Sequence, residues 1–278
     1  MTTTKPTAAS IDVRGLTITL DGPAPIVAVR DLDATIEPGE LACVLGPSGC
    51  GKSTLLGALA GFIAPTAGAI IIDGEPVRGD RLRSDVGVVF QQPTLLPWKT
   101  VEDNVAFGLK VRGVGRRERR AAAHDLLAQM GLGDFARAYP AQLSGGMQQR
   151  VEIARVLITQ PRIVLMDEPF GSLDAQTRLA MQELLLAIWA RIGVTVVFVT
   201  HDIDEAIFLG DRILVMSPRP GRIREVLPVD FARPRKPELA TTAQFAAIKR
   251  RCLGLLRDEP FVPTIAPALD ERRSHVGH

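Results

Sequence analysis

One stretch of the sequence has the residue types and spacing needed to bind a phosphate chain. Gly46-Pro-Ser-Gly-Cys-Gly-Lys52-Ser53 follows the apolar run Leu41–Leu45 and precedes a stretch of helical pattern, Thr54–Phe62. The glycines let backbone N–H groups turn toward a phosphate, and the N-terminus of the next helix adds positive potential. Lys52 can reach the outer phosphates and Ser53 can ligate Mg²⁺. A glycine-rich turn could match by chance, but a strand before it and a helix after it are the context that nucleotide binding requires. The residues expected to hold the nucleotide here are Gly46, Pro47, Ser48, Gly49, Cys50, Gly51, Lys52, Ser53 and Thr54.

Two adjacent carboxylates follow another apolar run and could complete a hydrolytic site. Asp167 and Glu168 come directly after Ile163–Met166. Asp167 is expected to hold Mg²⁺, and Glu168 is placed to polarise an attacking water as general base. Taken alone, such a pair is usually a strand end that meets a solvated turn. In a chain that also has a phosphate-binding loop, the pair predicts nucleotide hydrolysis.

The elements that must position these residues alternate between short apolar runs and helical stretches. Several of the runs are apolar throughout, which favours strands buried on both faces of a mostly parallel sheet and therefore an α/β fold. The predicted strands are Leu41–Leu45, Ala69–Ile72, Val86–Phe90, Ile163–Met166, Val194–Thr200 and Ile213–Met216. The predicted helices are Arg116–Met130, Met147–Thr159, Ala175–Arg191 and, after a linker at Arg233–Pro237, Phe245–Arg257.

A third motif resembles the signature of ATP-binding cassette proteins. Leu143-Ser144-Gly145-Gly146 matches it, but Met147 stands where the family usually has Gln, so only the backbone contacts of Ser-Gly-Gly carry over. Other cassette motifs follow in order along about 11–223. Gln91 resembles the glutamine that senses Mg²⁺ and water, Ser172-Leu173-Asp174 the loop that connects the two halves of a dimer, and His201 the switch histidine.

The resemblance implies a phosphate-loop (RecA-like) core with an antiparallel β subdomain and a helical subdomain. The ATPase domain would span 11–230, with the helical subdomain at about 95–160 and a short C-terminal helical extension at 231–278. It also implies a homodimer that binds ATP and Mg²⁺, in which the signature of one subunit faces the phosphate loop of the other. The implied catalytic residues are Lys52, Gln91, Glu168 and His201. The implied Mg²⁺ ligands are Ser53, Gln91 and Asp167, and the signature and dimer-loop contacts are Ser144, Gly145, Gly146 and Asp174.

Several stretches point to a transporter and to its membrane partner. The loop Leu95-Leu-Pro-Trp98 is apolar and could tuck into its own subdomain, but in this family the region binds a short helix of the polytopic permease. Together with Val101–Leu109 and Ser217–Arg222, it resembles the nitrate/sulfonate/taurine importers, with taurine-type subunits nearest. Such a subunit would lie peripherally on the cytoplasmic face of the cell membrane, in a system with a periplasmic or lipid-anchored solute-binding protein.

Composition and charge weigh against other classes. The net charge is +2, from 33 basic and 31 acidic residues, so no nucleic-acid partner is expected. Three cysteines without CxxC spacing favour neither a disulfide framework nor a zinc site. The uncharged stretch Ser53–Ile72 contains glycines and Pro65, which indicates a helix, a turn and a strand, not a membrane span. A non-transport cassette ATPase acting on nucleic acid or ribosomes, an exporter subunit and a phosphate-loop kinase remain alternatives.

Two further features leave open questions. The basic run at Arg112, Arg116, Arg117, Arg119 and Arg120 is interpreted as a solvated helix face, with contact to phospholipid headgroups as the alternative. Cassette proteins usually stack an aromatic residue on adenine, but this chain has no Phe, Tyr or Trp before Phe62. Leu20, Ile26 or Val27 would supply only apolar contact there, so we expect weaker discrimination between ATP and GTP than in a relative with the aromatic residue.

Overall fold

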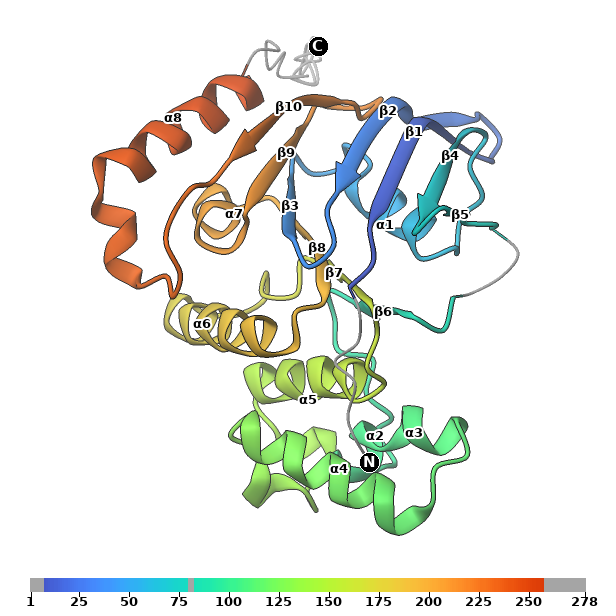
Figure 1. Ribbon diagram of the computed structural model, residues 1–278, viewed down its shortest axis with the longest axis vertical. Helices are drawn as coiled ribbons and strands as arrows, with labels where there is room; N and C mark the ends of the chain where they lie inside the picture. The colour runs from blue at the N-terminus through green and yellow to red at the C-terminus, as the bar shows by residue number, and fades with distance from the viewer. Residues whose placement is uncertain (1–7, 80–82, 258–278) are drawn as a thin grey trace, which may run out of the picture.

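The computed structural model describes residues 8–79 and 83–257. Figure 1 shows two sheets in the upper part of the molecule and a unit of helices, α2 to α5, below them. The predicted fold class is confirmed, because a phosphate-loop core carries both an antiparallel sheet and a helical unit.

The core is a six-stranded sheet in the order β10-β9-β3-β8-β7-β6. Its strands are β3 (Leu41–Leu45), β6 (Val86–Val89), β7 (Ile163–Asp167), β8 (Thr195–Thr200), β9 (Arg212–Met216) and β10 (Ile223–Pro228). All neighbouring pairs are parallel except β9 with β10. The side chains of β3 are all buried, with Leu41, Cys43 and Leu45 facing one apolar cluster and Ala42 and Val44 the other. The continuous apolar runs therefore mark strands buried on both faces, as predicted.

One face of this sheet is covered by α1 (Lys52–Leu59) and by a second, antiparallel sheet. That sheet has the order β2-β1-β4-β5, with β1 at Ile11–Leu20, β2 at Ile26–Ile36, β4 at Ala67–Ile72 and β5 at Glu75–Pro76. The uncharged stretch Ser53–Ile72 thus forms a helix, a turn and a strand, as predicted. No helix in the described part of the chain is long and apolar enough to cross a membrane.

The opposite face is covered by α6 (Ala175–Ile192), α7 (Ile203–Leu209) and α8 (Ala243–Arg257), which lie side by side in Figure 1. Three residues of α8, Phe245, Cys252 and Leu255, are buried in the same apolar cluster as the strands. The last helix therefore packs as part of the main core.

The segment Arg233–Pro237, expected to be a linker, is held against the end of α7 by hydrogen bonds and an ion pair. Arg235 is buried, and its guanidinium donates hydrogen bonds to the carbonyls of Ile207, Phe208 and Gly210 at the end of α7. Arg233 pairs with Asp211 at 2.6 Å. Composition alone suggested a linker because it does not show that these guanidinium groups satisfy carbonyls left open at a helix C-terminus.

The helical unit contains α2 (Val101–Val105), α3 (Phe107–Val111), α4 (Arg116–Gln129) and α5 (Gly145–Leu157), with short 3₁₀ turns at Gly133–Phe135 and Pro140–Gln142. A third 3₁₀ turn, Pro237–Thr241, precedes α8.

The loop that leads into the helical unit is held by one buried side chain, that of Asn104 on α2. The Asn104 Oδ1 accepts a hydrogen bond from the backbone N–H of Leu96 at 2.7 Å. Its Nδ2 donates to the carbonyls of Leu96, Lys99 and Thr100 at 3.0–3.1 Å. A single amide thereby binds the backbone at residues 96, 99 and 100, next to a backbone hydrogen bond from the N–H of Lys99 to the carbonyl of Leu96.

We predict that Asn104→Ala lowers the free energy of unfolding by about 2–4 kcal/mol, because it leaves a buried N–H and several carbonyls without partners. The measurement is urea unfolding followed by circular dichroism. Gln92→Ala, an exposed amide in the same loop, serves as the matched control and should change stability little. Equal stability of the two variants would contradict the anchoring role of Asn104.

Candidate nucleotide-hydrolysis site

Four neighbouring parallel strands bring the predicted motifs to one edge of the sheet. In the order β3, β8, β7 and β6, these strands end at the phosphate loop, at His201, at Asp167 and just before Gln91. Because parallel strands have their carboxyl ends at the same edge, residues more than 100 positions apart in the sequence meet there.

The phosphate loop takes a backbone path that requires glycine. Gly49 and Gly51 have φ of 76° and 108°, and a Cβ on Gly51 would lie 2.7 Å from the carbonyl oxygen of Ala28. The helix α1 begins directly afterwards at Lys52, with no side-chain cap at its N-terminus. Its first N–H groups are therefore available to a phosphate group.

The Lys52 ammonium lies in the middle of this site. The residue is 5% exposed, and its Nζ donates to the carbonyls of Gly46 at 2.9 Å and Pro47 at 3.0 Å. The same Nζ lies 3.6 Å from Glu168 Oε1. A buried lysine held by its own loop can bind a phosphate with little reordering of its side chain.

Glu168 links this lysine to the predicted switch histidine. Its Oε2 lies 2.8 Å from His201 Nδ1, and its carboxylate is largely shielded from solvent while His201 stays half exposed. Glu168 also has a φ of 44°, a conformation that costs a non-glycine residue about 1–3 kcal/mol and that clusters at active sites. The geometry lets Glu168 accept a proton from a water and share it with His201.

Asp167 and Ser53 present oxygen atoms beside Lys52. Burial raises the pKa of the Asp167 carboxyl, although a hydrogen bond from the Ser53 hydroxyl partly offsets this. The described residues hold no group of three or more His, Cys, Asp or Glu placed to bind a metal ion. A hydroxyl and one carboxylate suit Mg²⁺, which is commonly held by few protein oxygens together with substrate phosphates.

The structure does not bring every predicted residue to this edge. The signature residues Ser144, Gly145 and Gly146 lie in the helical unit, where Ser144 caps α5 by accepting a hydrogen bond from the Met147 N–H at 3.3 Å. Gln91 is exposed, and its side chain forms no hydrogen bond with the described residues of the phosphate loop.

Asp174 caps another helix at the surface. It accepts hydrogen bonds from the N–H groups of Gln176 and Thr177 at the start of α6. A Cβ on Gly146 would lie 2.7 Å from Thr177 Cγ2 on α6 and 3.9 Å from Leu173 Cδ2, so the signature packs against the start of α6 and against the predicted dimer loop. Met147, which replaces the usual Gln, is partly buried and packs against the core.

Two interactions near the site were not predicted. Arg219 Nε donates to the Gly49 carbonyl of the phosphate loop at 3.0 Å. Glu152 on α5, with 0% exposure, accepts hydrogen bonds from Thr94 at 2.9 Å and from Arg155 at 2.7 Å. The only sequence signal was that Arg219 belongs to the stretch Ser217–Arg222. No local signal indicated the contact of Glu152 with Thr94, because Thr94 lies 58 residues away.

The apolar side chains expected to contact adenine and those of the predicted permease loop differ in how far the fold covers them. Leu20 and Ile26 pair beside the turn of the β1–β2 hairpin and are 36% and 44% exposed. Weaker base discrimination stays a prediction. Leu95 packs against the core and Leu96 is partly buried, whereas Trp98 is 72% exposed. Within the predicted permease loop, therefore, the tryptophan is the main group that the fold leaves uncovered.

A phosphate loop followed by a carboxylate-bearing strand, with a separate signature helix, defines an ATPase of the ATP-binding cassette class. The family model described as ABC transporter matches residues 29–171, just over half of the chain. The chain belongs to the ABC transporter family, and it is an ATPase.

Individual proteins of this family are similar to most of the chain. The chain is 48% identical over 234 residues to an uncharacterized ABC transporter ATP-binding protein of Methanocaldococcus jannaschii, covering 84% of this chain and 86% of the relative. It is 58% identical over 189 residues to a taurine import ATP-binding protein of Rhizobium johnstonii, covering 68% and 71% respectively. A dimeric ATP-binding cassette solved with ADP and phosphate matches with a TM-score of 0.71 and 35% identity, over 80% of this chain and all of that one.

A buried carboxyl, Glu205, supports the segment that carries His201. Glu205 accepts hydrogen bonds from the Thr200 hydroxyl at 2.5 Å and from Gln182 at 3.1 Å. Burial raises its pKa, and these two hydrogen bonds only partly offset the shift. The folded protein therefore binds a proton at Glu205 more tightly than the unfolded chain does.

We predict that stability depends on pH through Glu205 in a defined direction. Since the folded pKa lies above the unfolded one, the contribution of Glu205 to the unfolding free energy decreases as pH rises through that interval. Glu205→Gln removes this dependence, so its stability relative to wild type should improve from pH 4 to pH 7. The check is urea unfolding of both proteins at several pH values; a constant difference would contradict the prediction.

Proposed function

We propose that this chain is the ATP-hydrolysing subunit of an importer for a small anion or zwitterion, with taurine or another alkanesulfonate first and nitrate next. The observation that carries the proposal is the 58% identity to a taurine import ATP-binding protein. An exporter subunit, or a cassette ATPase acting on nucleic acid or ribosomes, would have the same phosphate loop. The exposed Trp98 favours a membrane partner over these alternatives.

Hydrolysis in this proposal needs two copies of the chain. Ser144–Gly146 lie in the helical unit and the phosphate loop lies at the sheet edge, so a second subunit supplies the signature to each nucleotide. The match to a dimeric cassette solved with ADP and phosphate supports this arrangement. ATP then joins the two subunits, and loss of the terminal phosphate separates them.

Within each site, Lys52 binds the terminal phosphates and Glu168 takes the proton of the attacking water. His201 orients Glu168 through the 2.8 Å contact, and its half-exposed ring is free to contact the terminal phosphate of the nucleotide. Ser53, Asp167 and Gln91 would hold Mg²⁺, which supplies positive charge against the charge that develops on the phosphates. Asp174 would carry the dimer loop toward the other subunit.

The membrane side of the proposal uses the loop Leu95–Trp98. The Thr94–Glu152–Arg155 contacts join the start of this loop to α5, the helix that the signature begins. Movement of a permease helix against Trp98 would therefore be transmitted to the signature. The subunit would lie on the cytoplasmic face of the cell membrane, and a periplasmic or lipid-anchored receptor would deliver the solute.

We predict that Glu168→Gln reduces ATP turnover by a factor of about 10²–10⁴, because an amide cannot act as general base. The variant should form a stable dimer with ATP and Mg²⁺, measurable by light scattering on a sizing column. Glu183→Gln, an exposed change of the same kind on α6, is the control and should keep full turnover. A Glu168→Gln protein that stays monomeric at saturating ATP would overturn the two-subunit site.

Transport is tested with the membrane partner. We expect the tagged chain to co-purify with a polytopic permease, and Trp98→Ala to reduce the recovered permease about tenfold or more, since buried tryptophans dominate such interfaces. Phe135→Ala, which removes a 41% exposed aromatic side chain elsewhere in the helical unit, should leave the recovered permease unchanged. Uptake of labelled taurine and nitrate by the complete system identifies the solute. Recovery of nucleic acid instead of a permease would reject the importer.

A further inference from the structure

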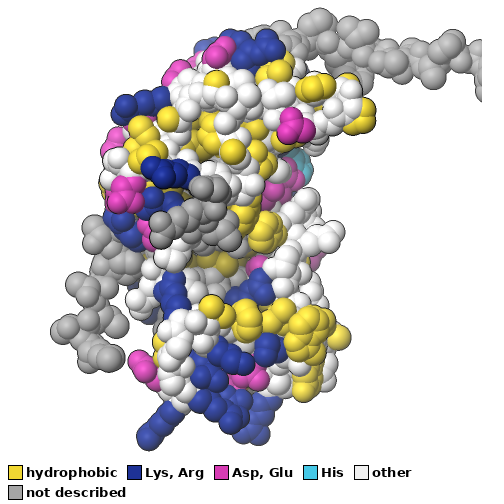
Figure 2. Space-filling model, turned by 90° about the vertical axis from the view of Figure 1, so that its right-hand side faces the viewer, with side chains coloured by type: hydrophobic (Ala, Val, Ile, Leu, Met, Phe, Trp, Pro, Cys, Tyr) yellow, Lys and Arg dark blue, Asp and Glu magenta, His cyan; other side chains and the backbone are white. Residues whose placement is uncertain are grey.

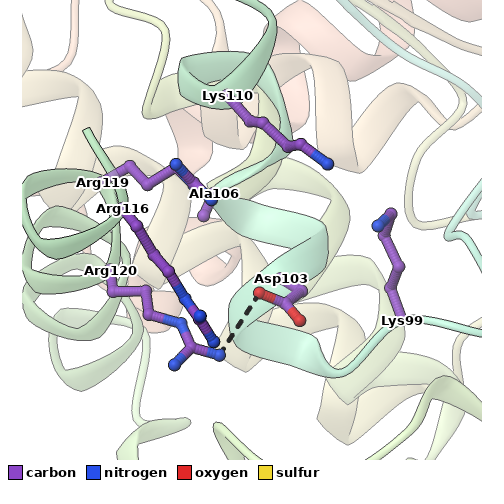
Figure 3. Close-up of a pocket in the computed structure, with 7 residues that line it drawn as sticks. All are labelled: Lys99, Asp103, Ala106, Lys110, Arg116, Arg119 and Arg120. Carbon is purple, nitrogen blue, oxygen red and sulfur yellow. Dashed lines mark ion pairs between the residues drawn. The ribbon is translucent and has the colours of Figure 1, made fainter. Parts of the chain in front are cut away.

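The helical unit contains a basic pocket of about 230 Å³ that the nucleotide site does not use. The walls of the pocket are the loop before α2, the helices α2 and α3, and the first turns of α4. Figure 3 shows the side chains that line it. Those residues are Lys99, Asp103, Ala106, Lys110, Arg116, Arg119 and Arg120.

The pocket gathers five cations around one carboxylate. Asp103 lies 3.7 Å from Arg120, and Arg119 donates to the carbonyl of Val114 at 3.1 Å. Lys99, Lys110 and Arg116 form no ion pair with any described residue. Figure 3 shows the lysines extending into the same space from α3 and from the loop before α2, while Arg116 runs beside Arg120 toward Asp103. Cations brought together from three elements repel one another, and an anion between them would relieve this repulsion.

The structure therefore revises the interpretation of the basic run as a single solvated helix face. Arg112 lies outside α4 and donates to the carbonyls of Thr159 and Ser84, so it holds the chain together. Arg117 is exposed and does not line the pocket. The remaining three arginines of the run line one cavity together with two lysines from other elements.

Exposed apolar side chains accompany these cations. Val111 is 72% exposed and Phe107 is 36% exposed, and both lie on α3 together with Lys110. Lys99 Nζ lies over the Phe107 ring at 5.7 Å. Figure 2 shows Lys and Arg side chains gathered over the lower end of the helical unit, with hydrophobic side chains beside them. Basic groups next to exposed aromatic and aliphatic side chains are typical of surfaces that meet a bilayer.

We propose that this basic pocket binds a phosphoryl group, supplied by the headgroup of an anionic phospholipid. Lysine and arginine are the usual ligands of phosphate oxygens, as point charges and as forked donors respectively. The lipid source follows from the apolar neighbours, which a small phosphate ester in solution would leave exposed. The proposal rests on the proposed function, which places the subunit at a membrane, but it adds a contact that does not involve the permease.

The test is co-sedimentation of the purified chain, without permease or nucleotide, with phosphatidylcholine vesicles that contain or lack phosphatidylglycerol. Wild type should bind the anionic vesicles. Replacing Lys99, Lys110 and Arg116 together by Gln should weaken binding about 100-fold, at roughly fivefold per cation near an anionic surface.

A matched triple variant distinguishes binding at the pocket from attraction by the overall positive charge of the protein. Arg30, Arg78 and Arg117 are exposed, lie outside the pocket and, when changed together to Gln, alter the net charge equally. This control should keep vesicle binding within a few-fold of wild type. Circular dichroism and ATP turnover show that both variants are folded.

The following results would contradict binding of an anionic lipid at this pocket. Equal loss of binding in the two triple variants, or equal binding of wild type to both vesicle types, would overturn it. Saturable binding of inorganic phosphate without binding to anionic vesicles would assign the pocket to a solute and reject the lipid. Because the assay contains no permease and no ATP, a negative result leaves the importer proposal standing. Failure of permease co-purification, in turn, would not affect a positive vesicle result.

Discussion

Hydrogen bonding between the parallel strands β3, β8, β7 and β6 is the constraint on which the site depends. It aligns the carboxyl ends of these strands, so that Glu168 lies 3.6 Å from Lys52 and 2.8 Å from His201. The side chains within β3, β7 and β8 are largely apolar on both faces. The residues expected to bind or hydrolyse the nucleotide stand at or directly after the carboxyl ends of these strands. A shift in register between β7 and β8 would separate Glu168 from His201, whose contact is made across that strand pair.

The same sheet edge contains energetically costly features that a purely structural strand end would avoid. Glu168 has a positive φ, the Asp167 carboxyl has a raised pKa because of burial, and Lys52 is nearly inaccessible. Such features are tolerated when the surrounding structure compensates for them, and they gather where charge must be managed during a reaction. The compensation here comes from the two large apolar clusters on either side of the sheet.

Contacts outside the edge connect the hydrolysis site to other surfaces. Glu152 and Arg155 bind Thr94, and Asn104 binds the backbone on both sides of Trp98, so the loop is hydrogen-bonded to both α5 and α2. Arg235 in turn joins α7 to the segment before α8. Side chains of this kind join elements that lie far apart in the sequence.

The sequence by itself determined the phosphate loop, the carboxylate pair, the α/β class and most strand positions, because glycine spacing and uninterrupted apolar runs are local signals. The predicted strand boundaries differ from the observed ones by at most two residues, as at Ala69 and Thr195. Only the tertiary structure showed the roles of Asn104, Glu152, Arg219 and Arg235, whose partners lie elsewhere in the chain or in backbone groups that no residue type reveals. The basic run likewise became a pocket only when Lys99 and Lys110 folded against α4. These cations come from separate elements that only packing brings together, so the order of residues in the sequence does not reveal the pocket.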